Sequence, residues 1–150
     1  MSKPFSVDLV CICEYATQDV TGRALLAGIF PGMIGFEREP SNWPQYFIVV
    51  SIVPRSKSFE FSIKFLDEKS KNLVTFDGKY DNQSDPDEKE RIMFLAQIPP
   101  VKFTGAGKHE LIVLNGKHTI ESRDFPVIVG SQLPMQLGSV QMSHKIGDIN

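Results

Sequence analysis

The sequence predicts an all-β protein, a β-sandwich of about eight strands, from three observations. Apolar side chains recur with a period of two, turn residues follow every ten to fifteen positions, and no long helical pattern is present. The clearest alternation runs from Phe59 to Phe65, with polar side chains between the apolar ones. Such a strand has one buried and one solvated face. The chain of 150 residues has the size of one domain, which we place at residues 1–129.

The other strands are predicted from β-branched and aromatic runs that end at turn residues. These runs are 7–13, 24–30, 46–53, 73–76, 92–98, 110–114 and 117–121. Between the last two, Asn115-Gly116 predicts a tight hairpin turn, because a type I′ turn needs positive φ at both central residues. The run 125–129 has the opposite parity to Ile120, so we expect a bulge or kink near residues 123–126.

One segment is compatible with either a helix or a strand. Asp85 followed by Pro86 is typical of a helix start, and the apolar block after it, 92–96, could continue that helix. Pro99 and Pro100 would cut such a helix short. We therefore expect at most one helical turn near 86–90, followed by a strand.

Several of these segments, in this order, resemble an uncharacterised bacterial family of small immunoglobulin-like β-sandwich domains. They are DLVCICE at 8–14, GRALLAGIF at 22–30, Trp43-Pro44, IPPVKF at 98–103, GAGKHEL at 105–111 and Phe125-Pro126-Val127. The resemblance implies an immunoglobulin-like antiparallel β-sandwich and no particular function. Such domains often carry a tyrosine two residues after the glycine that corresponds to Gly107, where its hydroxyl ties down a corner. This sequence has His109 there, and an imidazole N–H could make a similar bond.

The composition argues against several functional classes. A net charge of −2 lacks the basic excess of nucleic-acid binders or of polybasic membrane binders. No nucleophile elbow, phosphate-binding loop or zinc-protease motif is present, so we expect a protein that is not an enzyme and uses no cofactor or metal. Cys11 and Cys13 lie two apart on a strand and are expected to be buried free thiols. The first residues do not read as a signal peptide, which favours the cytoplasm.

Two segments carry the candidate binding residues. The loop 31–44 contains Met33, Phe36 and Trp43, which either cap the open end of the sandwich or form a binding surface. The C-terminal arm, 130–150, contains the alternating residues Leu133, Met135 and Leu137, which suit an extended segment that pairs with a sheet edge.

Two functions remain open from the sequence. The first is a non-enzymatic module that binds a protein partner or assembles with itself, with a homo-oligomer possible through the arm. The alternative is a calcium- or carbohydrate-binding sandwich that uses the end loops 31–44 and 77–91. Loop 77–91 is rich in the carboxylates that calcium prefers, and Trp43 and Tyr80 are aromatic groups on which a sugar could stack.

Overall fold

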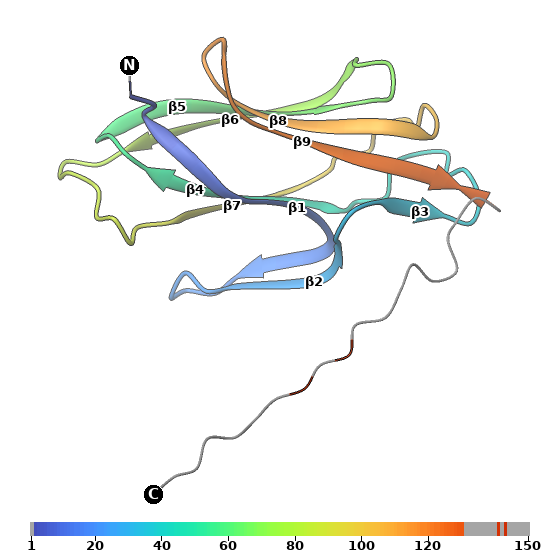
Figure 1. Cartoon of the computed structure of the whole chain (residues 1–150), viewed down its shortest axis with the longest axis horizontal. Coiled ribbons are helices and arrows are strands. Elements are labelled where there is room, and N and C mark those ends of the chain that lie inside the picture. Colours follow the sequence, from blue (N-terminus) through green and yellow to red (C-terminus); the bar gives the residue numbers. More distant parts are fainter. Residues whose placement is uncertain (1, 131–140, 142, 144–150) are drawn as a thin grey trace, which may run out of the picture.

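The computed structural model describes residues 2–130, 141 and 143, and consists of two β-sheets packed face to face (Figure 1). The described part of the chain contains nine strands and no helix. The strands are β1 (Phe5–Gln18), β2 (Ala24–Phe30), β3 (Ile34–Phe36), β4 (Phe47–Pro54), β5 (Ser58–Leu66), β6 (Asn72–Asp81), β7 (Ile92–Gln97), β8 (Gly107–Asn115) and β9 (His118–Val129). The predicted all-β sandwich is confirmed.

One sheet has the strand order β2-β1-β4-β7 and the other β3-β9-β8-β5-β6. All strand pairs are antiparallel except β3 with β9, which is parallel. The sequence had predicted a purely antiparallel sandwich, and the parallel pair β3–β9 corrects that prediction. Strand β3 has only three residues within the Gly- and Pro-containing segment 31–44, and so short a run gives no readable alternation.

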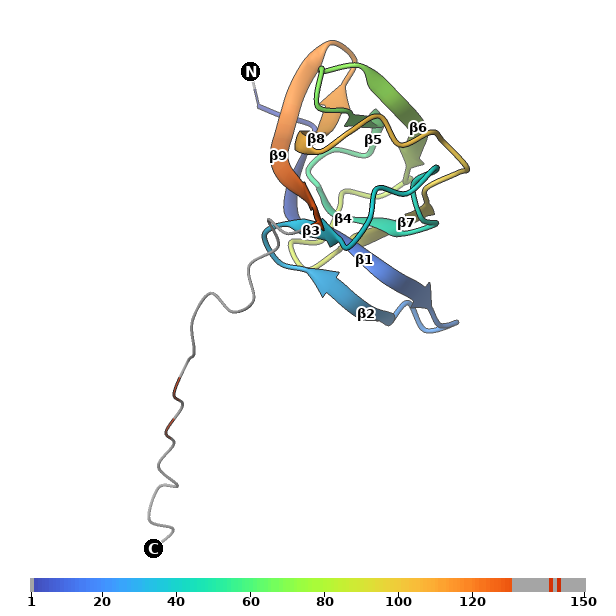
Figure 2. The ribbon, with the colours of Figure 1, turned by 90° about the vertical axis from the view of Figure 1, so that its right-hand side faces the viewer.

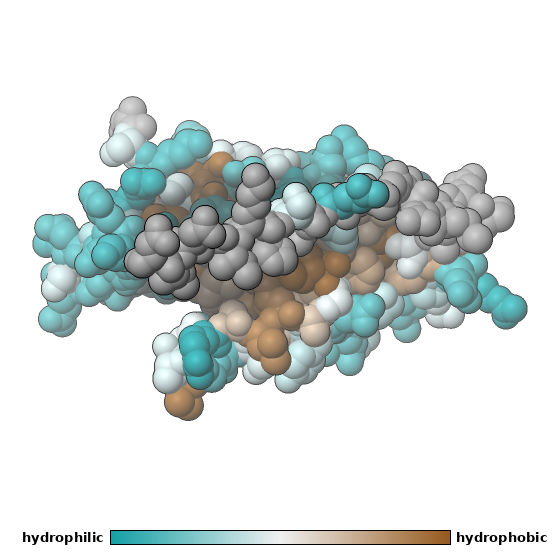
Figure 3. All heavy atoms as spheres, turned by 60° about the horizontal axis from the view of Figure 1, so that its bottom comes forward, coloured by the Kyte–Doolittle hydropathy of each residue, from teal (hydrophilic) through white to brown (hydrophobic). Residues whose placement is uncertain are grey.

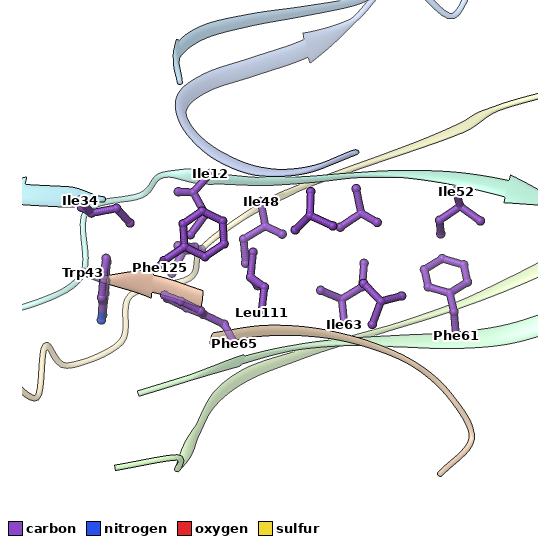
Figure 4. Close-up of a cluster of buried hydrophobic side chains, with 14 of the residues drawn as sticks. Ile12, Ile34, Trp43, Ile48, Ile52, Phe61, Ile63, Phe65, Leu111 and Phe125 are labelled. Carbon is purple, nitrogen blue, oxygen red and sulfur yellow. The ribbon is translucent and has the colours of Figure 1, made fainter. Parts of the chain in front are cut away.

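The core lies between the two sheets and is filled by alternate side chains from each (Figure 4). Strand β5 shows the predicted alternation, with Phe59, Phe61, Ile63 and Phe65 buried. Strand β4 is buried from Ile48 to its end, on both faces. A strand buried on both faces needs a second apolar layer outside the sandwich, and that layer is the start of the candidate site described below.

The hairpin between β8 and β9 turns one residue later than predicted. Its two loop residues are Gly116 and Lys117, with Gly116 at φ +61°. The side chain of Asn115 donates a hydrogen bond of 2.8 Å to the carbonyl of Glu60, which keeps Asn115 in β8, paired with His118.

The predicted parity switch is present, but it lies closer to the turn than residues 123–126. Leu114 pairs with Thr119 and Val113 with Glu121, so Ile120 is the extra, unpaired residue of a bulge. This bulge brings Phe125 and Val127 onto the buried face of β9.

The segment that could have been helical forms a turn followed by strand β7. The N–H of Glu90 donates to the carbonyl of Asp87 at 3.0 Å, and β7 begins at Ile92. Over the described residues, no helix is long and apolar enough to cross a membrane.

Candidate functional site

The outer face of the β2-β1-β4-β7 sheet carries no charged side chain along three cross-strand rows. Since side chains alternate along a strand, these residues point away from the core side chains of Val10, Ile12, Ile48 and Val50. The outward rows are Leu9, Ser51 and Met93; Cys11, Val49 and Leu95; and Cys13, Phe47 and Gln97. An outer sheet face is normally polar, so this one is built to be covered.

The β1–β2 hairpin covers part of this face. Strand β1 is shared, since its residues 5–13 pair with β4 and its residues 12–18 pair with β2. Beyond the shared residues the hairpin lies below the sheet (Figures 1 and 2). Ala16 and Leu26 pack there against Cys13 and Val49, and the rings of Tyr15 and Phe47 meet edge to face at 5.9 Å.

The covering hairpin explains why both cysteines are buried although they lie on the outer face of the sheet. Cys11 is 6% exposed and Cys13 is fully buried, and both thiols are free, as predicted. Burial raises the pKa of both thiols, so they stay protonated and poorly reactive at neutral pH. The cysteines therefore serve as small apolar residues between the sheet and the hairpin.

The hairpin also exposes large apolar side chains to solvent. Strand β2 is the edge of its sheet, and its sequence, ALLAGIF, has no polar side chain at all. Leu25 is 60% exposed and Ile29 50% exposed. Figure 3, in which the lower side of the view in Figure 1 comes forward, shows hydrophobic surface on this side of the molecule. Natural edge strands usually carry charges or prolines that prevent pairing with another chain, and β2 has neither. We call strand β2, with the exposed side chains of Tyr15, Leu25 and Ile29, the β2 surface.

A second apolar feature lies between the β2–β3 link and β9. It is a groove of about 630 Å³. Its lining consists of Pro31, Gly32, Met33, Pro126 and Ile128. We call it the Met33 groove, and none of its lining residues is charged.

The structure separates the three candidate residues of loop 31–44. Met33 lines the groove, whereas Trp43 is only 2% exposed and belongs to the core. Phe36 is half-buried and packs edge to face on Trp43 at 5.8 Å and on Phe103 at 5.5 Å. Phe36 and Trp43 therefore cap the end of the sandwich, which is the first of the two interpretations of this loop. The prediction that Trp43 is a surface contact was wrong, because its side chain is buried. Of the three candidates, only Met33 remains as an outward-facing contact.

The candidate residues of the arm, Leu133, Met135 and Leu137, lie outside the described residues. Tyr15, Leu25 and Ile29 were not among the candidates. For Leu25 and Ile29 the signal was the absence of polar residues in the run 24–30, a pattern that by itself indicates only a strand.

A polar cluster lies at the end of the sandwich where Trp43 is buried. The ring of His109 is fully buried, 5.1 Å from that of Trp43. Its Nδ1 lies 3.1 Å from the carbonyl oxygen of Gly107, and its Nε2 lies 3.7 Å from a carboxylate oxygen of Glu68. Among the described side chains, Trp43 Nε1 and His109 Nε2 are buried polar atoms that have no hydrogen-bond partner.

Asp67 fixes the loop beside this cluster. Its carboxylate accepts hydrogen bonds of 2.8 Å from the backbone N–H groups of Lys69 and Lys71. Burial opposes ionisation of Asp67, but these N–H donors outweigh it and leave its pKa lowered, with smaller help from Thr104 and His109. The cluster is thus a structural corner, consistent with the expected role of His109.

The buried imidazole makes stability depend on pH. Burial lowers the pKa of His109 below its ordinary 6.5, although the carbonyl of Gly107 and the carboxylates of Glu68 and Asp67 oppose this. Just below pH 6.5 the unfolded chain therefore binds a proton at His109 and the native protein does not. The free energy of unfolding falls as the pH drops below about 6.5, with a slope approaching about 1.4 kcal/mol per pH unit. Urea unfolding at pH 7.5, 6.5 and 5.5 measures this.

His109→Phe is the matched variant, since it keeps a buried ring without a titrating nitrogen. Its stability is expected to be flatter over the same pH window. The contribution of Asp67, whose pKa is lowered, is lost only below pH 3.8 and does not overlap. Equal slopes for the wild type and His109→Phe would contradict the neutral, buried state of His109.

The carboxylate-rich loop 77–91, called the acidic loop below, lies at the opposite end of the molecule from loop 31–44. Trp43 contacts Phe65 at the end of β5, whereas the N–H of Asn82 binds the carbonyl of Lys57 just before β5. Nine residues of strand separate these two ends by about 30 Å. Loops 31–44 and 77–91 therefore cannot contribute to one ligand site.

Within the acidic loop, several polar groups are already paired. Arg91 binds Asp8 at 2.8 Å, and the hydroxyl of Tyr80 donates to Glu90 at 2.8 Å while its ring stacks on Phe59 at 4.9 Å. The described residues contain no group of three or more His, Cys, Asp or Glu side chains arranged to hold a metal ion.

Comparison with known proteins identifies a family but assigns no activity. No curated protein matches the chain at a significant level. The model of a family of unknown function, DUF6941, matches residues 8–129, which run from within β1 to the end of β9. The chain therefore belongs to DUF6941, a family whose function is unknown.

Proposed function

We propose that this protein is a non-enzymatic protein-binding module, and that its partner adds an extended, uncharged strand to the free edge of β2. The observation that carries the proposal is the edge position of β2 combined with a sequence that has no polar side chain. An exposed edge offers unpaired N–H and C=O groups to a second chain, and strand addition of this kind is a common mode of peptide recognition.

The energetics favour an apolar partner. Leu25 and Ile29 are half or more exposed, and full burial of such a side chain contributes about 1.5–3 kcal/mol. A charged side chain placed against Leu25 or Ile29 would lose its hydration, which is costly, and β2 itself carries no charged side chain to pair with it. The nearby carboxylate of Glu14 in β1 lies over Gly28 and would repel an acidic partner. The matching partner segment is therefore uncharged, with apolar residues at alternate positions.

Within the same proposal, the sandwich is of immunoglobulin-like type. The order β1-β4-β7 corresponds to strands A, B and E of such domains, and β9-β8-β5-β6 corresponds to G, F, C and C′. His109 lies near the start of β8, at the position of the corner tyrosine. We also propose that the protein is of bacterial origin and lies in the cytoplasm, as expected from the sequence.

Selection from a random-peptide display library tests the proposed function. With immobilised wild-type protein we expect enrichment of uncharged peptides that have apolar residues at alternate positions. Leu25→Lys should weaken their binding at least about tenfold, because the ammonium group would be desolvated in the complex. The folded state is checked by circular dichroism, and retention is expected since Leu25 is exposed.

Gln83→Lys is the matched control, since it adds the same charge at an exposed position in the loop before β7. It should bind the selected peptides like the wild type. Peptides that bind Leu25→Lys equally well would remove β2 from the proposal. Sedimentation velocity on the same variants tells whether a second copy of the chain is the partner.

A further inference from the structure

The Met33 groove is an apolar surface separate from the β2 surface. Two segments distant in sequence form it, the link before β3 and the outer face of β9 at Pro126 and Ile128. Its volume of about 630 Å³ has room for more than one side chain, and none of its lining residues is charged. An open apolar concavity of this kind is typical of a docking site.

The described sandwich ends beside this groove. Gly130 directly follows β9 and has a φ of +77°, a left-handed conformation that residues other than glycine seldom adopt. The carbonyl oxygen of Glu37 lies beside Gly130, 3.9 Å from where a Cβ would be, which is an ordinary contact distance. This conformation takes the backbone out of the line of β9, so the chain that follows need not continue in the strand direction.

The next apolar residue is within reach of the groove. Leu133 is three residues beyond Gly130, or about 10 Å of extended chain. Ile128 and Pro126 are two and four residues before Gly130, or about 7 and 13 Å along β9. A chain that folds back at Gly130 therefore brings Leu133 alongside both, and alternation places Met135 on the same side.

The absence of charge and the short connecting chain both favour Leu133 and Met135 as the residues that occupy the groove. Residues 131–143 contain no charged side chain, which matches the uncharged lining of the groove. A tether of a few residues gives an effective concentration in the millimolar range, well above that of a second molecule in dilute solution. We propose that Leu133 and Met135 occupy the Met33 groove of their own chain. The proposal does not depend on the β2 surface.

A disulfide-trapping experiment on the full chain tests the proposal. Cysteines are introduced in the pair Met33→Cys and Leu133→Cys, and the rate of crosslinking is followed in oxidised glutathione. Cys11 and Cys13 do not interfere, since both are buried. We expect an intrachain disulfide within the monomer, identified by non-reducing electrophoresis and by mass spectrometry of the linked peptides.

The control pair is Arg38→Cys with Leu133→Cys. Arg38 is exposed, and its neighbour Glu37 lies next to Gly130, so an undocked arm reaches it as easily as it reaches Met33. The Met33 pair should crosslink at least about tenfold faster than this control. Equal rates would overturn the docked arm, and a faster crosslink found only between two chains would assign the groove to the arm of a second copy.

Discussion

Replacing Trp43 with alanine is expected to lower the free energy of unfolding by about 3–5 kcal/mol, the range for large aromatic residues in cores. Trp43 lies outside the regular strands but is buried, with ring centroids 5.2 Å from Phe65, 5.3 Å from Phe103 and 5.1 Å from His109. A domain of this size has about 5–15 kcal/mol in total, so the variant should be close to unfolding. Urea denaturation followed by circular dichroism measures the loss.

Trp43→Phe separates packing from hydrogen bonding. The indole Nε1 has no partner, so its removal deletes no hydrogen bond and a ring is retained. We expect a smaller loss, about 1–2 kcal/mol, from the reduced volume. A loss equal to that of Trp43→Ala would contradict this and would mean that the N–H group is bound. A loss below about 1 kcal/mol for Trp43→Ala would contradict the burial itself.

The second large effect is expected at Gly78 in β6. Gly78 pairs with Phe61 of β5, and the Phe61 ring lies over it so closely that a Cβ at Gly78 would overlap the ring. Phe61 cannot move away easily, because it packs against the rings of Phe5 and Phe94. Gly78→Ala should therefore cost about 2–3 kcal/mol, at the upper end of overpacking effects.

Gly32→Ala provides the comparison for this prediction. A Cβ at Gly32 would meet no atom of the described residues within 4 Å, and the backbone of Gly32 does not adopt a positive φ. Its free energy of unfolding should change by no more than about 0.5 kcal/mol. Similar urea midpoints for Gly78→Ala and Gly32→Ala would contradict the close contact between Phe61 and Gly78.

The parts of the fold that were predictable from the sequence are those set by local alternation. Phe59 to Phe65 alternates because one face meets the core and the other meets water, and the structure has that strand. The bulge was predictable from the conflict in parity between Ile120 and Phe125, but its position was not. That position depends on Asn115, whose side chain binds the carbonyl of Glu60, a residue far away in sequence.

The candidate site was harder to predict, since burial in the finished fold depends on which layer covers a strand. An uncharged run such as ALLAGIF has the same sequence pattern whether its own domain covers it or leaves it open. In loop 31–44 no periodicity tells which apolar side chain points inward. Trp43 is buried while Met33 lines an outer groove, a difference that arises from contacts with Phe103 and Pro126.

Amide hydrogen exchange on β2 is the most direct measurement of the proposed function. It is followed on the wild-type protein with and without a peptide selected as above. If the peptide adds as a strand, the amides of Ala24–Phe30 on the free edge should exchange more slowly in the complex, because they donate to the peptide backbone. Unchanged exchange in β2, with protection elsewhere, would contradict the assignment of this edge as the docking surface.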